Sequence, residues 1–246
     1  MAKRIAVMLD GGHVRVHAKR AAKNFDPDYI EKIGHACAAE GEVIHRIMYH
    51  DCPPFAGTAV LPVSGERKTF TAKDDWLKLL SYKELFSVRL GILKFRGFVL
   101  KKEKIPYTPG EPLTDDDFYP EFEQKGVDMH IGIDMATIAS NGSVELIALA
   151  TNDTDRIPAM KYARRAGLQV ALVVVPGYTP VPELLSHSDY RRSIDWPLRE
   201  RTSSCPTAAV LSDGRTPPAP RCRGTAIDRE CSSGTTYLPP QARFLL

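Results

Sequence analysis

Residues 144–175 read VELIALATNDTDRIPAMKYARRAGLQVALVVV, and this stretch decides the fold. Its two ends, 144–150 and 170–175, are short apolar runs, which are typical of buried strands. Between them a polar turn is followed by a helical segment at residues 158–166. Two strands joined by a helix predict a right-handed βαβ unit, and the wholly apolar second strand indicates a parallel sheet covered on both faces.

The same alternation continues toward the N-terminus. Residues 4–9 (RIAVML) and 42–49 (EVIHRIMY) are predicted strands, and residues 28–39 form a predicted helix between them. The strongest helical spacing lies at residues 126–139, where apolar side chains recur every three or four positions. This alternation predicts an α/β fold with three layers, α/β/α, and a mainly parallel central sheet.

The middle of the chain is less regular. The two prolines in residues 50–54 (HDCPP) predict a loop, because proline cannot extend a central strand. Residues 69–86 form a predicted helix, and residues 89–100 read as a strand pair or as one strand with a bulge. The polar, proline-containing residues 103–124 are interpreted as an exposed loop.

Composition changes near residue 199. Hydrophobic residues make up 43% of the chain, which is enough for a sizeable core. Residues 200–246, however, are rich in Ser, Thr, Pro, Arg and Gly and cannot offset the entropy of ordering. We therefore expect one folded domain at residues 1–199 and a disordered tail at residues 200–246.

Charge and cysteine content bear on the partners and the compartment. The net charge of +3 permits nucleic-acid binding without arguing for it. The five cysteines are odd in number and form no CxxC pair, which is typical of free thiols in a reducing cytosol. Asp10 interrupts the first apolar run too early for a signal peptide, and no stretch approaches the roughly 18 apolar residues that span a bilayer. A cytoplasmic protein without a membrane partner is expected.

Aspartates follow the predicted strands at the points where those strands end. Asp10 follows the first strand, and Asp153 and Asp155 follow the first strand of the βαβ unit. Because the carboxyl ends of parallel strands share one edge of a sheet, we expect these carboxylates to meet. Asp128, at the start of the strongest predicted helix, would join them. Divalent ions such as Mg²⁺ prefer oxygen ligands and promote phosphodiester cleavage. Carboxylates close together repel one another without a metal, so the pattern implies a cation site or raised pKa values.

Each of these carboxylates also has a structural alternative. Asp10 precedes Gly11 and Gly12, which predict a sharp turn. Asp128 and Asp153 are placed to cap helices by accepting bonds from free amides. The aspartates are therefore a weak signal when each is taken alone.

Three further acidic positions are also ambiguous. Asp155 can be a solvated residue of a first helical turn. Asp134 lies about 120° around its helix from Asp128, so the two need not face one site. Residues 115–117 are three consecutive aspartates that read as a solvated loop.

Three motifs occur in order along residues 3–190. They are VMLDGG at 7–12, KGVDMHIGIDM at 125–135, and ALATNDTDRIPAMKYARRAGLQVALV at 148–173. Together they resemble the NYN domain, the LabA-like branch of the PIN-like nucleases. The resemblance implies a PIN-like fold and a metal-dependent ribonuclease, a hydrolase that uses Mg²⁺ or Mn²⁺ and has RNA as its partner. The catalytic and metal-binding residues it implies are Asp10, Asp128, Asp153 and Asp155, with Asp134, Lys125, His13 and Arg156 in support.

Two positions depart from the family pattern. The family usually has asparagine where this chain has His13, and an aromatic residue where it has Arg156. His13 can still hydrogen-bond a ligand or water, and Arg156 can pair with a phosphate or with a neighbouring carboxylate. These departures favour, as the alternative, a non-catalytic RNA-binding or regulatory module with a degraded nuclease site.

Two further points concern partners and competing folds. Basic side chains that can track a phosphate backbone, or simply cover solvated helix faces, are Arg15, Lys19, Arg20, Lys23, Lys161, Arg164 and Arg165. A phosphatase-like hydrolase would need DxDx[TV] directly after its first strand, whereas Asp10 is followed by Gly-Gly-His. Assembly into a homo-oligomer is left open by the sequence.

Overall fold

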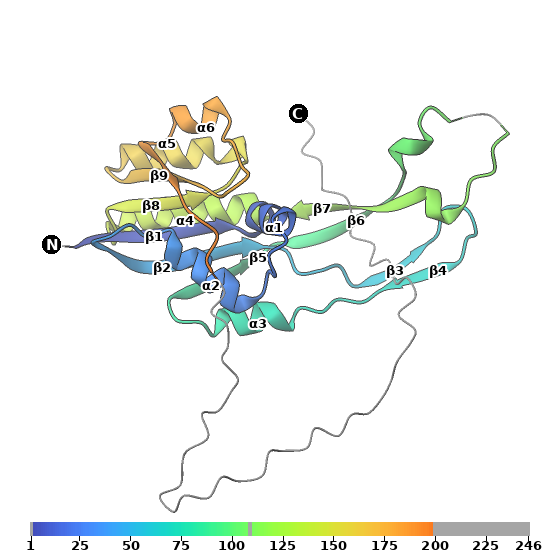
Figure 1. Cartoon of the computed structure of the whole chain (residues 1–246), viewed down its shortest axis with the longest axis horizontal. Coiled ribbons are helices and arrows are strands. Elements are labelled where there is room, and N and C mark those ends of the chain that lie inside the picture. The colour runs from blue at the N-terminus through green and yellow to red at the C-terminus, as the bar shows by residue number, and fades with distance from the viewer. Residues whose placement is uncertain (1, 108–109, 199–246) are drawn as a thin grey trace, which may run out of the picture. The chain divides into compact units, whose positions relative to one another are not determined.

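The central element of the protein is a six-stranded sheet in which all neighbouring strands are parallel (Figure 1). The structure is a computed structural model that describes residues 2–107 and 110–198, so the predicted tail at 200–246 lies outside the described residues. The strand order is β10-β9-β8-β1-β2-β5. The strands are β1 (Lys3–Asp10), β2 (Glu42–Asp51), β5 (Phe86–Leu90), β8 (Leu146–Ala150), β9 (Gln169–Val174) and β10 (Tyr190–Ser193).

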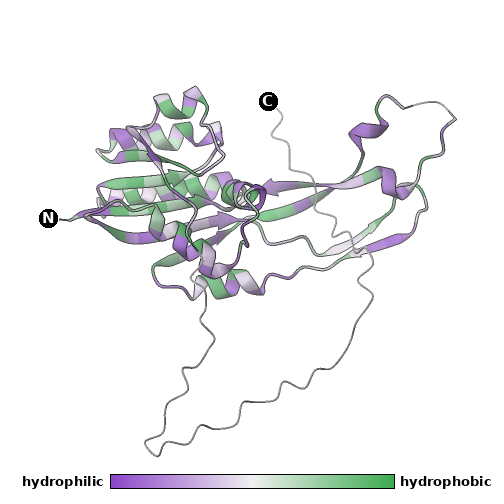
Figure 2. Ribbon diagram, in the orientation of Figure 1, coloured by the Kyte–Doolittle hydropathy of each residue, from purple (hydrophilic) through white to green (hydrophobic). Residues whose placement is uncertain are grey.

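Helices cover both faces of this sheet. In β1, Ile5, Val7 and Leu9 pack on the side of α1, α2 and α3, whereas Ala6 and Met8 pack on the side of α4, α5 and α6. Figure 2 shows the apolar strands between these helices. The predicted α/β fold with a mainly parallel central sheet is confirmed. The helices are α1 (Gly11–Arg20), α2 (Pro27–Ala36), α3 (Asp75–Ser81), α4 (Val127–Asn141), α5 (Ile157–Arg165) and α6 (Pro182–Ser186).

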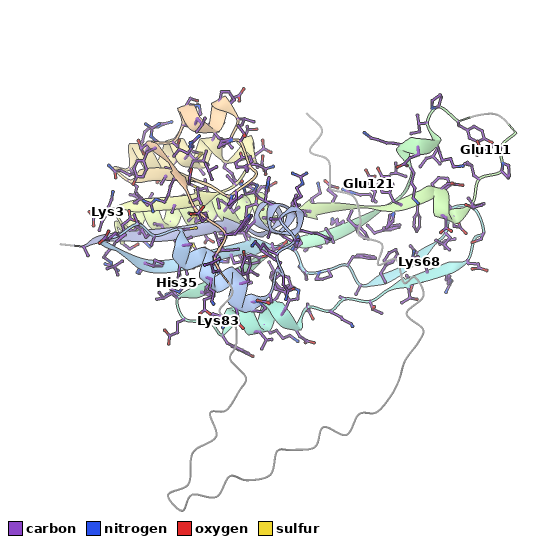
Figure 3. The ribbon with its side chains drawn as sticks, viewed as in Figure 1. Lys3, His35, Lys68, Lys83, Glu111 and Glu121 are labelled. Atoms are coloured by element: carbon purple, nitrogen blue, oxygen red, sulfur yellow. The ribbon has the colours of Figure 1, made fainter. Side chains whose placement is uncertain are left out.

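Two antiparallel hairpins follow the carboxyl ends of β2 and β5 in the chain. One pairs β3 (Gly57–Val60) with β4 (Arg67–Phe70), and the other pairs β6 (Ile92–Leu100) with β7 (Phe118–Lys125). Lys68 on β4, labelled in Figure 3, belongs to the first hairpin. Rings of both hairpins and of the preceding loop contact one another; they are Phe55, Phe70, Phe95, Phe98 and Phe122. Short 3-10 helices are η1 (Lys102–Lys104), η2 (Asp115–Asp117) and η3 (Thr154–Arg156).

The hairpins correct two predictions. The helix predicted at residues 69–86 is wrong at both ends, because α3 covers only Asp75–Ser81 and Phe70 belongs to β4. The exposed loop predicted at residues 103–124 contains most of β7. In each hairpin a phenylalanine packs on rings that are distant in sequence, and such packing outweighs local polar composition.

The loop predicted at residues 50–54 is also wrong in part, because β2 continues through its first two residues. His50 pairs with Asp10 of β1, and Asp51 pairs with Leu90 of β5. The strand therefore ends before the two prolines. Among the described residues, no helix combines the length and apolarity needed to cross a membrane.

Gly11 and Gly12 begin α1 and do not form the predicted sharp turn, and neither adopts a positive φ. The requirement for glycine at position 11 is steric. A Cβ there would lie 2.4 Å from the Tyr49 hydroxyl and 2.6 Å from the Asp51 carboxylate. At Gly12 the closest atom would be 3.4 Å away, which is an ordinary contact. Gly11 thus lets α1 start close against β2.

We expect Gly11→Ala to destabilise the protein by about 1–3 kcal/mol, the usual cost of overpacking. Its neighbours are fixed, because the Tyr49 hydroxyl donates to Asp51 at 2.7 Å and Arg15 also pairs with Asp51. Gly12→Ala is the matched control, since alanine favours a helix and meets no clash there. Urea unfolding measures both variants, and equal destabilisation would contradict the steric explanation.

Candidate metal centre

The candidate site lies at the carboxyl edge of the sheet, where β1 and β8 are neighbours. Leu9 pairs with Ala150 near the ends of these strands, which brings the next residues, Asp10 and Thr151, together. The Thr151 hydroxyl donates a hydrogen bond to Asp10 Oδ2 at 3.2 Å. The parallel pairing therefore joins the first predicted site residue to the turn that follows β8.

Local capping bonds orient two of the aspartates. Asp10 caps α1, because its Oδ1 accepts from the His13 amide at 3.2 Å. Asp153 caps η3, because its Oδ1 accepts from the Asp155 amide at 3.0 Å. Each cap uses one carboxylate oxygen and leaves the other to face its surroundings. Asp10 and Asp153 therefore do cap helices, as the structural alternatives proposed. In each residue the second carboxylate oxygen takes no part in the cap.

The third contributing element is α4. Gly126 precedes it with a φ of 86°, a left-handed conformation that favours glycine. This turn starts the helix at the sheet edge and places Asp128 in its first turn. Asp128 makes no capping bond of its own, since Gly126 is the capping residue and no side chain caps the helix.

The carboxylates of these elements converge. Ligand oxygens of Asp128, Asp153 and Asp155 lie within 4.8 Å of one another. One nitrogen, Nη2 of Arg156, lies 2.6 Å from Asp128, 3.4 Å from Asp153 and 3.8 Å from Asp10. The four aspartates placed at this edge from the sequence thus surround one small region, which we call the aspartate cluster.

Burial makes ionisation of the inner carboxyls unfavourable. Asp10 and Asp153 are buried, whereas Asp128 and Asp155 are exposed. Burial raises the pKa of Asp10, against the opposing effects of the Arg156 charge and the His13 amide. Burial also raises the pKa of Asp153, and the charges of Asp155 and Asp128 add to that rise. Both inner carboxyls are therefore disfavoured as anions in the folded protein, mainly because they are removed from water.

One buried oxygen in the cluster lacks a donor. Asp153 Oδ2 accepts no hydrogen bond from any described residue, although Arg156 Nη2 lies 3.4 Å away. A buried acceptor without a donor costs about 1–3 kcal/mol, so a ligand at this atom would be stabilising. Carboxylate oxygens are the ligands that Mg²⁺ and Mn²⁺ prefer. The three carboxylates and the buried Asp153 oxygen without a hydrogen-bond donor together fit a divalent cation.

Arg156 is the cation of the cluster. Its side chain is 2% exposed, and its Nε and Nη1 have no hydrogen-bond partner among the described residues. The sequence left open whether Arg156 pairs with a phosphate or with neighbouring carboxylates, and the structure shows pairing with carboxylates. One guanidinium carries one positive charge, whereas four ionised carboxylates carry four negative charges. The cluster of ionised carboxylates therefore keeps a net negative charge with Arg156 in place.

Comparisons with known proteins do not assign a family. No family model matches the chain, and no curated protein matches it significantly. A solved structure of a protein of unknown function from Vibrio parahaemolyticus is similar, with 16% sequence identity and a TM-score of 0.44. The match covers 79% of this chain and 94% of that one. The strand pairing of the chain itself shows the parallel α/β sheet of the predicted architecture.

Two predicted supporting residues lie apart from the aspartate cluster. Asp134 Oδ2 bonds with His50 Nε2 at 2.9 Å and with Arg89 Nε at 3.2 Å. The Lys125 ammonium pairs with Glu123 on the same strand. Asp134 therefore fastens α4 to β2 and β5, in line with its position about 120° around the helix from the cluster.

We expect Asp134→Asn to lower stability by about 1–3 kcal/mol at neutral pH and to leave metal binding unchanged. Burial raises the pKa of Asp134, but His50 and Arg89 outweigh it and the pKa is lowered. The ionised form is thus favoured in the folded state, and its contribution is lost as the pH falls through the lowered pKa. Urea unfolding at neutral and acidic pH, with a Mn²⁺ titration, tests this; lost Mn²⁺ binding would place Asp134 in the metal site.

Six of the seven basic residues identified in the sequence, all except Arg20, divide into two groups. A cleft of about 480 Å³ is lined by residues that include Arg15, Lys19, Lys23, Phe25 and Trp76. By contrast, the cations of α5 lie in its C-terminal half, close to the start of β9 at the amino edge of the sheet. These α5 cations are Lys161, Arg164 and Arg165, and they line a separate depression.

The sequence did not reveal Asp51 as a neighbour of the site. Asp51 is buried at the end of β2 and accepts bonds from Arg15, the Tyr49 hydroxyl and the Cys52 amide. Its charge contributes to the raised pKa of Asp10. Residues 50–54 were predicted to form a loop, so Asp51 was not expected at the end of a strand beside the site. The pairing also occupies Arg15, so Lys19 and Lys23 are the cations lining the cleft that have no ion pair with a described residue.

Proposed function

We propose that the protein is a metal-dependent ribonuclease that hydrolyses RNA phosphodiester bonds at the aspartate cluster. The observation that supports this best is the convergence of Asp128, Asp153 and Asp155 within 4.8 Å, with one buried Asp153 oxygen lacking a donor. Carboxylates gathered at the carboxyl edge of a parallel sheet are suited to hold Mg²⁺ or Mn²⁺ near a substrate.

Each residue has a distinct part in this proposal. Asp128, Asp153 and Asp155 hold the ion, and Asp10 completes the site from β1. When bound, the ion supplies Lewis acidity and a more acidic water, which phosphodiester hydrolysis requires. The proposal requires no side-chain nucleophile.

Arg156 has two parts in this proposal. Its guanidinium balances some of the carboxylate charge when no ion is bound, since Nη2 lies within 3.8 Å of three of the aspartates. Its Nε and Nη1 lack partners among the described residues, but both atoms are buried, so they reach a phosphate oxygen only after the side chain moves. Arginine donors bind phosphate oxygens strongly because both groups are charged.

We place the RNA backbone along the cleft beside α1. Changing both Lys19 and Lys23 to alanine should weaken RNA binding about tenfold and lower the salt dependence by about two contacts, because each phosphate contact releases counterions. The matched control changes Lys161 and Arg165, which lie on α5, to alanine. Filter binding at two salt concentrations measures both, and equal losses would contradict this placement.

A non-catalytic RNA-binding or regulatory module is the second candidate, and the position of Arg156 favours it. If Arg156 is the permanent counter-charge of the cluster, divalent ions have no role. RNA would then bind to the α1 cleft without being cut.

Incubation of labelled single-stranded RNA with the pure protein separates the two candidates. We expect cleavage with Mn²⁺ or Mg²⁺ and none with EDTA. Binding of RNA that stays intact in all three conditions would contradict the nuclease proposal and support the binding module. The protein's melting curve in each buffer serves as the control for folding.

A further inference from the structure

Helix α1 carries a second group of potential metal ligands, separate from the aspartates. His13 and His17 are four residues apart and therefore lie on one face of the helix. Their ring centroids are 4.9 Å apart, with 64° between the ring planes. Tyr178, from the segment after β9, lies 4.6 Å from the His13 ring and 5.4 Å from the His17 ring. We call these three side chains the histidine box.

His13 is the most unusual member of the box. It is 5% exposed, and neither of its ring nitrogens bonds to a described residue. A neutral imidazole carries one donor and one acceptor, and each costs about 1–3 kcal/mol when it is buried without a partner. If the His13 side chain served only for packing, an apolar ring at this position would avoid the cost of burying unpaired nitrogens. The unpaired nitrogens therefore point to a ligand.

The other two side chains leave room for that ligand. The His17 ring forms no hydrogen bond with a described residue, so its nitrogens are available. The Tyr178 hydroxyl is buried and makes no hydrogen bond of standard geometry to a described residue. Burial raises the pKa of this hydroxyl, and the nearby Val181 amide acts in the opposite direction. The centroids of the two imidazole rings and the Tyr178 ring thus lie within 5.4 Å of one another, and the His13 nitrogens and the Tyr178 oxygen have no hydrogen-bond partner among the described residues.

The separation of the two imidazoles suits a shared ion. With metal–nitrogen distances of about 2.0 Å and a nearly tetrahedral angle, two imidazoles on one ion have ring centres roughly 5 Å apart. The observed separation is 4.9 Å. A neutral imidazole binds a metal through a ring nitrogen, and both ring nitrogens of His13 lack a partner among the described residues.

We propose that His13 and His17 bind a transition metal ion of the Zn²⁺ class, with the Tyr178 hydroxyl as an oxygen ligand beside them. Imidazole nitrogen suits Zn²⁺, Cu²⁺ and Ni²⁺, whereas Mg²⁺ and Mn²⁺ prefer the oxygens of the aspartate cluster. This site shares no side chain with the aspartate cluster, so its occupancy can be tested separately from the proposed nuclease function. Its ion would fasten α1 to the segment after β9.

A bound ion would also act on the neighbouring cluster. The His13 amide donates to Asp10 Oδ1 at 3.2 Å, so fixing the His13 ring fixes the cap of α1. The histidine box is therefore a structural metal site whose occupancy stiffens one wall of the aspartate cluster.

Calorimetric titration with Zn²⁺ in excess Mg²⁺ tests this proposal. The wild type should bind one Zn²⁺ and melt at a higher temperature, and His17→Gln should bind at least about tenfold more weakly, as expected when a metal site loses a ligand. His35→Gln is the matched control, because His35 is an exposed histidine on α2 (Figure 3). It should bind Zn²⁺ like the wild type.

Two further measurements keep the outcome clear. Asp153→Asn should retain full Zn²⁺ binding, which separates this site from the nuclease centre, so failure of one proposal leaves the other standing. If His17→Gln is too unstable to titrate, visible absorption of Co²⁺ bound to the wild type, displaced by Zn²⁺, reports the nitrogen-containing site. Unchanged affinity in His17→Gln, absence of Co²⁺ absorption in the wild type, or lost Zn²⁺ binding in Asp153→Asn would overturn the proposal.

Discussion

Asp153→Asn should abolish metal-dependent RNA cleavage while the fold and RNA binding survive. We expect a rate loss of at least about a thousandfold, or about 4 kcal/mol of transition-state free energy. Asparagine keeps the shape of aspartate and can still accept the Asp155 amide bond that caps η3. What it removes is the negative charge at Oδ2, the buried oxygen without a donor.

The same variant should be more stable than the wild type in metal-free buffer at neutral pH. Burial raises the pKa of Asp153 above its usual 3.8, so the ionised carboxylate disfavours the folded state. That penalty is complete above the raised pKa and vanishes as the pH falls toward 3.8. The stability difference between variant and wild type should therefore shrink on acidification.

Cleavage rate, RNA affinity and urea unfolding measured together test this prediction. Asp134→Asn is the matched control, because Asp134 is a buried aspartate of α4 whose bonds go to His50 and Arg89. It should lose stability and keep cleavage, the reverse of Asp153→Asn. If Asp153→Asn cuts RNA as fast as the wild type, Asp153 is only a cap for η3.

Arg156→Met should produce the largest change in stability. Removing one partner of a buried ion pair costs about 3–5 kcal/mol, because the remaining charges are left uncompensated. Here those charges are the carboxylates of Asp10, Asp128 and Asp153, all within 3.8 Å of Arg156 Nη2. Methionine is flexible and fills much of the same space, so the loss reflects charge more than volume.

Mn²⁺ should restore much of that stability, since the ion replaces the missing positive charge. The melting temperature of Arg156→Met should therefore rise more with Mn²⁺ than that of the wild type. Arg192→Met is the matched control, because it breaks a largely buried pair with Glu42, the first residue of β2, at the other end of that strand from the cluster. A loss of stability in Arg156→Met that Mn²⁺ does not reverse would show that the cluster cannot hold a cation.

The predictable parts of the fold have local signals. The apolar runs of β1, β8 and β9 and the spacing in α4 identify these elements by themselves. Parallel topology then predicts that residues after the strands meet at one edge, and Asp10 and Asp153 do lie there. The placement of these aspartates at one edge of the sheet could be predicted from the sequence, because it depends mainly on where the strands end.

The parts that could not be predicted depend on contacts between distant segments. β4 and β7 look polar because much of their apolar content is a few phenylalanines, and Phe70 and Phe122 pack on rings far away in the chain. The role of Arg156 was ambiguous because its partners come from three separate elements. A guanidinium cannot be assigned to carboxylates or phosphate until those elements are assembled.

Titration of the protein with Mn²⁺, followed by the electron paramagnetic resonance signal of the free ion, tests the aspartate cluster most directly. Wild-type protein should remove Mn²⁺ from solution by saturable binding, and Asp153→Asn should bind it far more weakly. Mg²⁺ should compete for the same site, whereas Zn²⁺ held at the histidine box should not. Wild-type protein that leaves the free Mn²⁺ signal unchanged, or an Asp153→Asn variant that binds Mn²⁺ equally well, would contradict a metal centre built on these aspartates.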